Sequence, residues 1–143
     1  MSKATDDVLA ERQRQIEAEG WTEEHDDRHT DGGLSAAAAC YAMHSALEEG
    51  IRSGRIARYC DRTKPFDQFV PDYWPWQMEW WKPTSARRNL VKAAALLIAE
   101  IERLDRDALK TPNEKVRGPE AALSPEAPSR LPGSAAPEPS SGD

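Results

Sequence analysis

The strongest hydrophobic pattern in the chain lies just after Pro83. Large apolar side chains recur there at alternating spacings of four and three residues, which places them on one face of an α-helix. Thr84 or Ser85 can cap the start of this helix. We therefore expect it to be the central core helix and to bury its apolar face. That face consists of Leu90, Ala94, Leu97, Ile101 and Leu104, and is widened by Val91, Ala95 and Ile98.

A weaker helical pattern occupies residues 6 to 19. Its apolar stripe is narrow, and Arg12 and Gln15 lie near the same face. Such a helix either lies on the domain surface or directs its polar groups toward a polar partner. Gly20 can end it in a left-handed conformation. The stripe consists of Val8, Leu9 and Ile16, and the capping oxygens at the start are those of Thr5, Asp6 and Asp7.

A third pattern, over residues 33 to 53, predicts another helix that Asp31 can cap. Four successive alanines, residues 36–39, leave room for a neighbouring helix to approach closely. The predicted face consists of Leu34, Ala37, Ala38, Tyr41, Ala42 and Ser45.

Residues 55–83 have no helical period, because prolines interrupt a run of large aromatic rings. So many rings would not be left in water, so this aromatic connector is expected to lie across the helices and close their core. Of the tryptophans at positions 74, 76, 80 and 81, most are expected to be buried.

The composition changes after residue 110. Seven of the eleven prolines lie beyond it, and no aromatic residue does. Such a segment buries too little apolar surface to order itself. The expected fold is all-α: a small three-helix domain over residues 1–110 with an irregular aromatic connector, followed by a disordered Pro/Ser/Ala-rich tail over residues 111–143.

Charge and cysteine content narrow the classes of function. A net charge of -6 argues against nonspecific binding of long nucleic acid through a basic surface. Only Cys40 and Cys60 are present, which fits a reducing cytosol rather than a disulfide framework. No apolar stretch has the length of a signal-peptide core or a membrane span. We expect a cytoplasmic protein that does not enter membranes.

The densest polar stretch is the turn from Gly20 to His29. If it is helical, His25 and His29 lie one turn apart on one face and can reach the same metal ion, with Asp26 or Asp27 as an oxygen ligand and Glu100 from the last helix completing the site. The competing interpretation is structural: Asp27 or Asp31 caps a helix, and the histidines hydrogen-bond locally or pair with carboxylates.

A second candidate is a magnesium site that combines Glu11 with Glu100 and Glu102. All-α nucleotide pyrophosphohydrolases hold magnesium between paired acids on neighbouring helices. Glu102 and Asp105 match one half of that pattern, whereas Glu24 and Asp27 match the other half poorly. A solvated face in which Glu102 pairs with Arg103 or Arg106 is the favoured interpretation.

A third candidate combines the connector with the start of the last helix. Aromatic faces such as those of Trp74 and Trp76 stack on bases, and cations near a helix start hold phosphate. Lys82, Arg87 and Arg88 cluster at that start. The combination suits a nucleotide or cyclic nucleotide, although most of the rings are expected to be core.

Several stretches resemble a group of small uncharacterised proteins encoded by phages and prophages of bacteria. The resemblance implies a phage accessory gene and gives no activity. It covers most of residues 8–106 and leaves out the tail. The matching stretches are Glu11-Arg12-Gln13-Arg14-Gln15-Ile16, Gly20-Trp21-Thr22, Glu24-His25-Asp26-Asp27, His29, Ala37-Ala38, Cys40-Tyr41-Ala42, Trp74-Pro75-Trp76, Trp80-Trp81-Lys82-Pro83, Arg87-Arg88, Leu90-Val91-Lys92-Ala93 and Ala99-Glu100-Ile101-Glu102-Arg103-Leu104-Asp105-Arg106.

The hypothesis that follows is a non-enzymatic accessory protein that binds a small anionic, nucleotide-like ligand or a host protein. Counter-defence is one role that analogy suggests for it. The alternative is a metal-dependent nucleotide hydrolase with a divalent cation, and self-association is compatible with both. The candidate ligand-binding residues are Arg12, Gln15, Trp21, His25, Asp27, His29, Trp74, Trp76, Lys82, Arg87 and Arg88. The candidate metal ligands are His25, Asp26, Asp27, His29 and Glu100.

Overall fold

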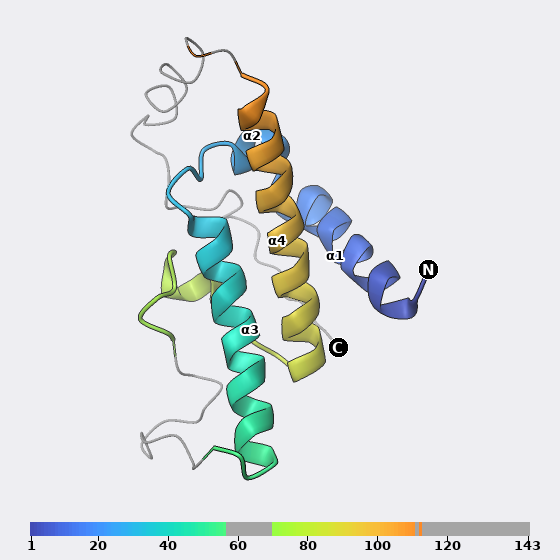
Figure 1. The fold of residues 1–143 in the computed structure, drawn as a ribbon, viewed down its shortest axis with the longest axis vertical. Coiled ribbons are helices and arrows are strands. Elements are labelled where there is room, and N and C mark those ends of the chain that lie inside the picture. The colour runs from blue at the N-terminus through green and yellow to red at the C-terminus, as the bar shows by residue number, and fades with distance from the viewer. Residues whose placement is uncertain (57–69, 111, 113–143) are drawn as a thin grey trace.

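The computed structural model describes residues 1–56, 70–110 and 112, and within them every regular element is helical (Figure 1). The predicted all-α fold is confirmed. The elements are α1 (Lys3–Glu19), α2 (Glu23–Asp26), α3 (Gly33–Arg52), the short 3-10 helix η2 (Met78–Trp80) and α4 (Ala86–Ala108). The predicted tail lies outside the described residues apart from Pro112, and so does Cys60.

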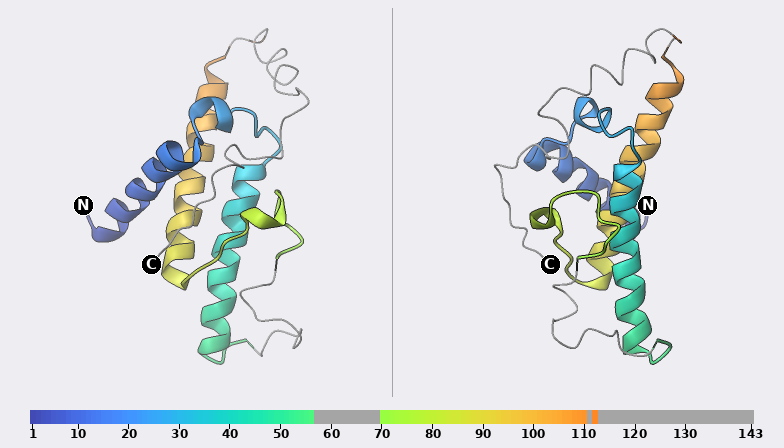
Figure 2. Two further views of the ribbon diagram at one scale, coloured as in Figure 1. Left: turned by 180° about the vertical axis from the view of Figure 1, so that it is seen from behind. Right: turned by 90° about the vertical axis from the view of Figure 1, so that its left-hand side faces the viewer.

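Helix α4 is the element on which the others pack. It runs between α3 and α1, with α3 antiparallel beside it (Figure 1). α2 also contacts α4. Helix α1 and the connector lie on the same side of the α3–α4 pair (Figure 2, right). None of the helices in the described ranges has the length and apolar content needed to cross a bilayer.

The helix ends follow local capping chemistry. α1 begins at Lys3, earlier than the sequence predicts, because the hydroxyl of Ser2 accepts a hydrogen bond from the backbone N–H of Thr5 at 3.2 Å. Gly20 ends α1 with φ 74°, as predicted. Ser85 caps α4 in the same way as Ser2 caps α1. Asp31 lies just before α3, and its Oδ1 accepts from the N–H of Gly33 at 3.0 Å.

The core is small and aromatic, and the connector completes it. Trp74, Trp76 and Trp81 are buried against α3 and α4, whereas Trp80 is only partly buried. Tyr41 on α3 lies 4.8 Å from the ring of Trp81 and 5.6 Å from that of Trp74. The prediction that the connector covers the helices and buries most of its tryptophans is confirmed for residues 70–83. The helix residues of this core are Leu34, Ala37, Ala38, Cys40, Ala93, Leu96 and Ala99.

The predicted inward face of α4 is wrong for its large residues, although Val91 and Ala95 beside it are buried as predicted. Leu90, Leu97, Ile101 and Leu104 are 50%, 46%, 57% and 50% exposed, so the strongest apolar stripe of the chain faces outward. The other buried residues of α4 are the apolar Ala93, Leu96 and Ala99 and the polar Asn89, Lys92, Glu100 and Arg103.

The two helices that flank α4, α3 and α1, explain the orientation of α4. The alanines of α3 bring its backbone close to α4, and that close packing favours Ala93, Leu96 and Ala99 over bulkier side chains. On the other flank, α1 buries Glu11, Arg12 and Gln15, which need polar partners on α4 because a buried polar group without one is costly.

Two adjacent leucines of α4 test this orientation. Leu96 is 1% exposed and Leu97 is 46% exposed. Leu96→Ala should lower the free energy of unfolding by about 2–5 kcal/mol, because it leaves a cavity in the core. Leu97→Ala should cost less than about 1 kcal/mol when unfolding by urea is followed at low protein concentration. Equal losses for the two variants would contradict the orientation of α4.

Candidate functional site

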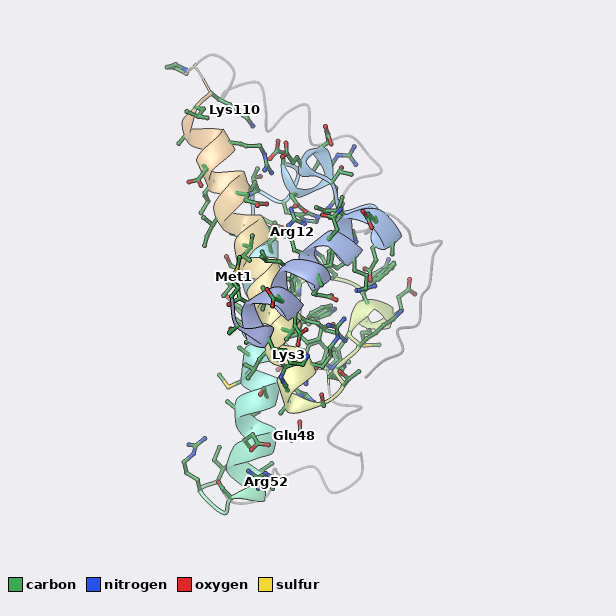
Figure 3. All side chains as sticks on the ribbon, turned by 90° about the vertical axis from the view of Figure 1, so that its right-hand side faces the viewer. Met1, Lys3, Arg12, Glu48, Arg52 and Lys110 are labelled. Atoms are coloured by element: carbon green, nitrogen blue, oxygen red, sulfur yellow. The ribbon has the colours of Figure 1, made fainter. Side chains whose placement is uncertain are left out.

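The turn that the sequence singled out is held by a buried ion pair. The carboxylate of Asp26, which is fully buried, accepts from Arg12 Nη2 at 2.9 Å. Arg12 also donates to the carbonyl of Trp21 at 3.3 Å and to Glu102 on α4 at 3.2 Å. Figure 3 shows Arg12 where α1 meets α4. Glu102 therefore pairs with Arg12, and not with Arg103 or Arg106 as the sequence suggested.

Two histidines continue this network. His25 Nδ1 lies 3.0 Å from Asp26 Oδ1, and His25 Nε2 lies 3.2 Å from His29 Nε2. A carboxylate only accepts, so His25 donates from Nδ1, and the two Nε2 atoms share one hydrogen bond whose donor depends on the tautomers. The network runs from Arg12 through Asp26 and His25 to His29.

The connector reaches this turn. The ring of Trp21 stacks on His25 at 5.9 Å, and Trp76 meets Trp21 at 6.0 Å and His29 at 5.5 Å. Trp21 and Trp76 are each only 8% exposed. These rings pack against each other, and no open ring face is left for a base to stack on.

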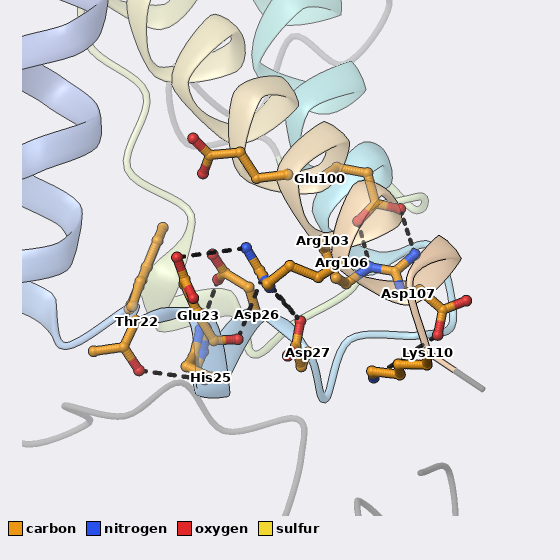
Figure 4. Close-up of polar contacts among 12 residues, drawn as sticks. Thr22, Glu23, His25, Asp26, Asp27, Glu100, Arg103, Arg106, Asp107 and Lys110 are labelled. Atoms are coloured by element: carbon orange, nitrogen blue, oxygen red, sulfur yellow. Dashed lines mark hydrogen bonds and ion pairs between the residues drawn. The ribbon is translucent and has the colours of Figure 1, made fainter. Parts of the chain in front are cut away.

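The acidic candidates around the turn pair with arginines of α4. Glu100 accepts from Arg103 at 2.8 and 3.0 Å, and Asp27 accepts from Arg106 at 2.9 Å (Figure 4). Among the described residues, no group of three or more His, Cys, Asp or Glu side chains can hold a metal ion. The contacts match the structural interpretation of the turn, with local pairing of histidines and carboxylates.

An open hollow of about 510 Å³ lies beside the turn, between the start of α3 and the connector. Asp31, Gly33 and Ala36 line one side, and Tyr73 and Pro75 line the other. None of the predicted ligand-binding residues lines it. The carboxylate of Asp31 also makes it a poor place for an anion.

Two of the remaining candidates, Lys82 and Arg88, lie elsewhere and form a basic cluster together with Arg14 and Lys92. At its centre is Glu11, which is 2% exposed. Glu11 accepts from Arg14 at 2.9 and 3.0 Å and from Gln15 at 3.1 Å, and it pairs with Arg88. Burial alone would raise the pKa of Glu11, but Arg14 and Arg88 hold it below its usual value.

Lys92 joins this cluster to the connector. Its Nζ donates to the carbonyl of Lys82 at 2.7 Å and lies 5.4 Å from the centre of the Tyr41 ring. The Lys82 N–H donates to the Tyr41 hydroxyl at 3.3 Å, and the Lys82 ammonium lies 5.6 Å over the ring of Trp80. Burial lowers the pKa of Lys92 to about 8, and the charge of Arg88 acts in the same direction.

One buried oxygen at the cluster accepts no hydrogen bond. Gln15 is 2% exposed, and its Nε2 donates to Glu11, whereas its Oε1 accepts no hydrogen bond. Reversing the amide would turn an oxygen toward the Glu11 carboxylate, so the amide orientation is set by its partner. A hydroxyl or amino group brought to this place would satisfy the oxygen.

The structure therefore divides the predicted residues into two groups. Arg12, Trp21, His25, Asp26, His29 and Trp76 meet at the turn, whereas Gln15, Lys82 and Arg88 meet at the basic cluster. Arg87 instead pairs with Asp7 at 2.8 Å, and Trp74 belongs to the core, where its Nε1 donates to the carbonyl of Gln77 at 3.0 Å.

Sequence reasoning missed Arg14 and Lys92 as members of a site. A signal was present, because Arg14 follows Glu11 by three residues and Lys92 follows Arg88 by four, so each pair shares a helix face.

Comparison with models of protein families, with curated proteins and with solved structures finds no match to this chain.

The histidine pair makes stability depend on pH. Burial lowers the pKa of His29 from 6.5 to about 4, and His25 adds to the effect. The unfolded chain takes up this proton below about pH 6.5 and the folded chain only near pH 4, so the contribution of neutral His29 is present above pH 6.5 and lost as the pH falls toward 4. The loss should reach about 3 kcal/mol.

His29→Gln keeps a donor for His25 and removes the titration. Urea unfolding measured at several pH values in this range should show a shallower loss of stability in the variant than in the unchanged protein. Identical slopes would show that His29 does not titrate in this way.

Proposed function

We propose that this protein is a non-enzymatic binder of a small anionic, nucleotide-like ligand, and that it holds the ligand at the basic cluster. The observation that carries the proposal is a local charge excess. Arg14, Arg88 and Lys92 lie around two acids, Glu11 and Glu19, so cations outnumber acids here in a chain of net charge -6. The connector contacts this cluster through the Lys82 carbonyl, which accepts from Lys92. Such a concentration of cations attracts a phosphate-bearing ligand.

The cluster offers each part of a nucleotide a suitable group. Arg14 and Arg88 have side chains that are 35% and 28% exposed, so their guanidinium groups are reachable and can hold phosphate oxygens in bidentate fashion. Lys92 adds a less exposed charge behind them. Trp80 supplies an aromatic ring beside Lys82, and Gln15 Oε1 supplies an acceptor for a ribose hydroxyl or a base amine.

Binding without catalysis fits the pairing of the acids. Glu11, Glu19, Glu100 and Asp27 each pair with an arginine, so these carboxylates are already engaged. The resemblance to phage-encoded proteins adds support for an accessory role. Sequestering a nucleotide signal of a bacterial defence system is one such role, argued by analogy.

Ligand binding can be measured by thermal unfolding and calorimetry with mononucleotides, cyclic dinucleotides and pyrophosphate. At about 100 times the dissociation constant, a ligand should stabilise the protein by about 2.7 kcal/mol. Arg88→Gln should weaken binding about tenfold or more, because a charge-assisted contact is lost, while Glu11 keeps its bonds from Arg14.

The matched control is Arg52→Gln. Like Arg88, Arg52 pairs with a glutamate, although here both residues lie on one helix, at the far end of α3 (Figure 3). This control should bind as the unchanged protein does. The proposal is overturned if none of these anions stabilises the protein, or if Arg88→Gln binds as tightly as the control.

The pH dependence of binding tests Lys92 directly. Because the pKa of Lys92 is near 8, its positive charge is lost between about pH 7 and pH 9, and the affinity for an anion should fall over that range. Lys92→Met should bind more weakly at pH 7 and show a flatter pH profile. Calorimetric titrations that give parallel profiles for the two proteins would exclude Lys92 from the site.

A further inference from the structure

The outward side of α4 carries a continuous apolar surface, which we call the outer stripe: Leu90, Ala94, Leu97, Ile101 and Leu104. Its four large residues are each about half exposed, between 46% and 57%. Fourteen residues separate its ends, a length of about 21 Å along the helix. Single exposed leucines are ordinary on protein surfaces, but an unbroken row of this length marks an interaction surface.

The spacing of the outer stripe is that of a coiled-coil seam. Leu90, Leu97 and Leu104 are seven residues apart, and Ala94 and Ile101 alternate with them. In heptad terms, leucine occupies every d position and Ala94 and Ile101 occupy the a positions. A seam of this kind fits against another helix with the same repeat.

We propose that a second copy of this chain covers the outer stripe, with the two α4 helices packed antiparallel. Leu97 lies midway between Leu90 and Leu104, so a two-fold axis at Leu97 places Leu90 of each copy against Leu104 of the other. The same operation sets the small Ala94 beside the large Ile101. The stripe is therefore complementary to itself.

The charges beside the outer stripe select the antiparallel orientation. Arg87 lies at the start of α4, whereas Asp105 and Asp107 lie near its end. Antiparallel packing brings the basic start of one helix to the acidic end of the other, and it also pairs opposite ends of the helix dipoles. Parallel packing would set like charges against each other at both ends.

This dimer leaves the basic cluster free. Two residues turn about 200° around a helix, so Lys92 lies on the opposite side of α4 from Leu90. Ligand binding at the basic cluster and dimerisation through the outer stripe can therefore be tested independently. The outer stripe by itself is small beside standard protein interfaces, so a dissociation constant in the micromolar range is expected.

Sedimentation equilibrium of the full chain over a range of concentrations tests the interface. The unchanged protein should form dimers, and Leu97→Glu should raise the dissociation constant more than about tenfold, because it sets two carboxylates against each other at the axis. Met43→Glu replaces an apolar residue of similar exposure, 58%, on α3 and should dimerise normally.

Disulfide trapping tests the orientation in a background where Cys40 and Cys60 are replaced by alanine. Leu90→Cys combined with Leu104→Cys should link two chains under oxidation, whereas Leu90→Cys alone should not. A protein that stays monomeric, or dimers that survive Leu97→Glu, would overturn the interface. Linking by Leu90→Cys alone would overturn the antiparallel orientation.

Discussion

The ion pair between Arg12 and Asp26 is enclosed by protein, since Asp26 is fully buried and Arg12 is 6% exposed. Removing one partner of such a pair leaves a buried charge unbalanced, at a typical cost of about 3–5 kcal/mol. The same guanidinium donates hydrogen bonds to the Trp21 carbonyl and to Glu102 on α4. One side chain of α1 thus fixes both the turn that follows α1 and the helix on which α1 packs.

This arrangement explains why a stretch rich in histidine and carboxylate is structural. Asp26 needs donors because it is buried, and Arg12 and His25 provide them. His25 then directs its Nδ1–H to Asp26 and its Nε2 to His29. The polar groups of the turn therefore form one hydrogen-bonded chain from Arg12 to His29. Trp21 and Trp76 pack against this chain and exclude water from it. A turn arranged in this way orients α1 against α4.

The sequence predicted the elements of this fold better than their orientation. Capping chemistry is local, so Gly20 and Ser85 marked helix ends correctly, and prolines among large rings identified the connector. The inward side of α4 could not be found in the same way, because it depends on what α1 and α3 present to it. Likewise, the basic cluster joins residues from α1 and α4 that only the packing of these helices brings together.

Helix α4 turns its row of large apolar residues outward, and this arrangement has a physical consequence. Its inward side satisfies buried charges, such as Arg103 with Glu100 and Arg88 with Glu11, so these residues cannot also provide apolar surface to the core. The apolar area that a small domain needs is instead supplied by tryptophans of the connector. Leu90, Leu97 and Leu104 therefore lie outside the core and form an apolar seam that contributes little to the fold of one chain.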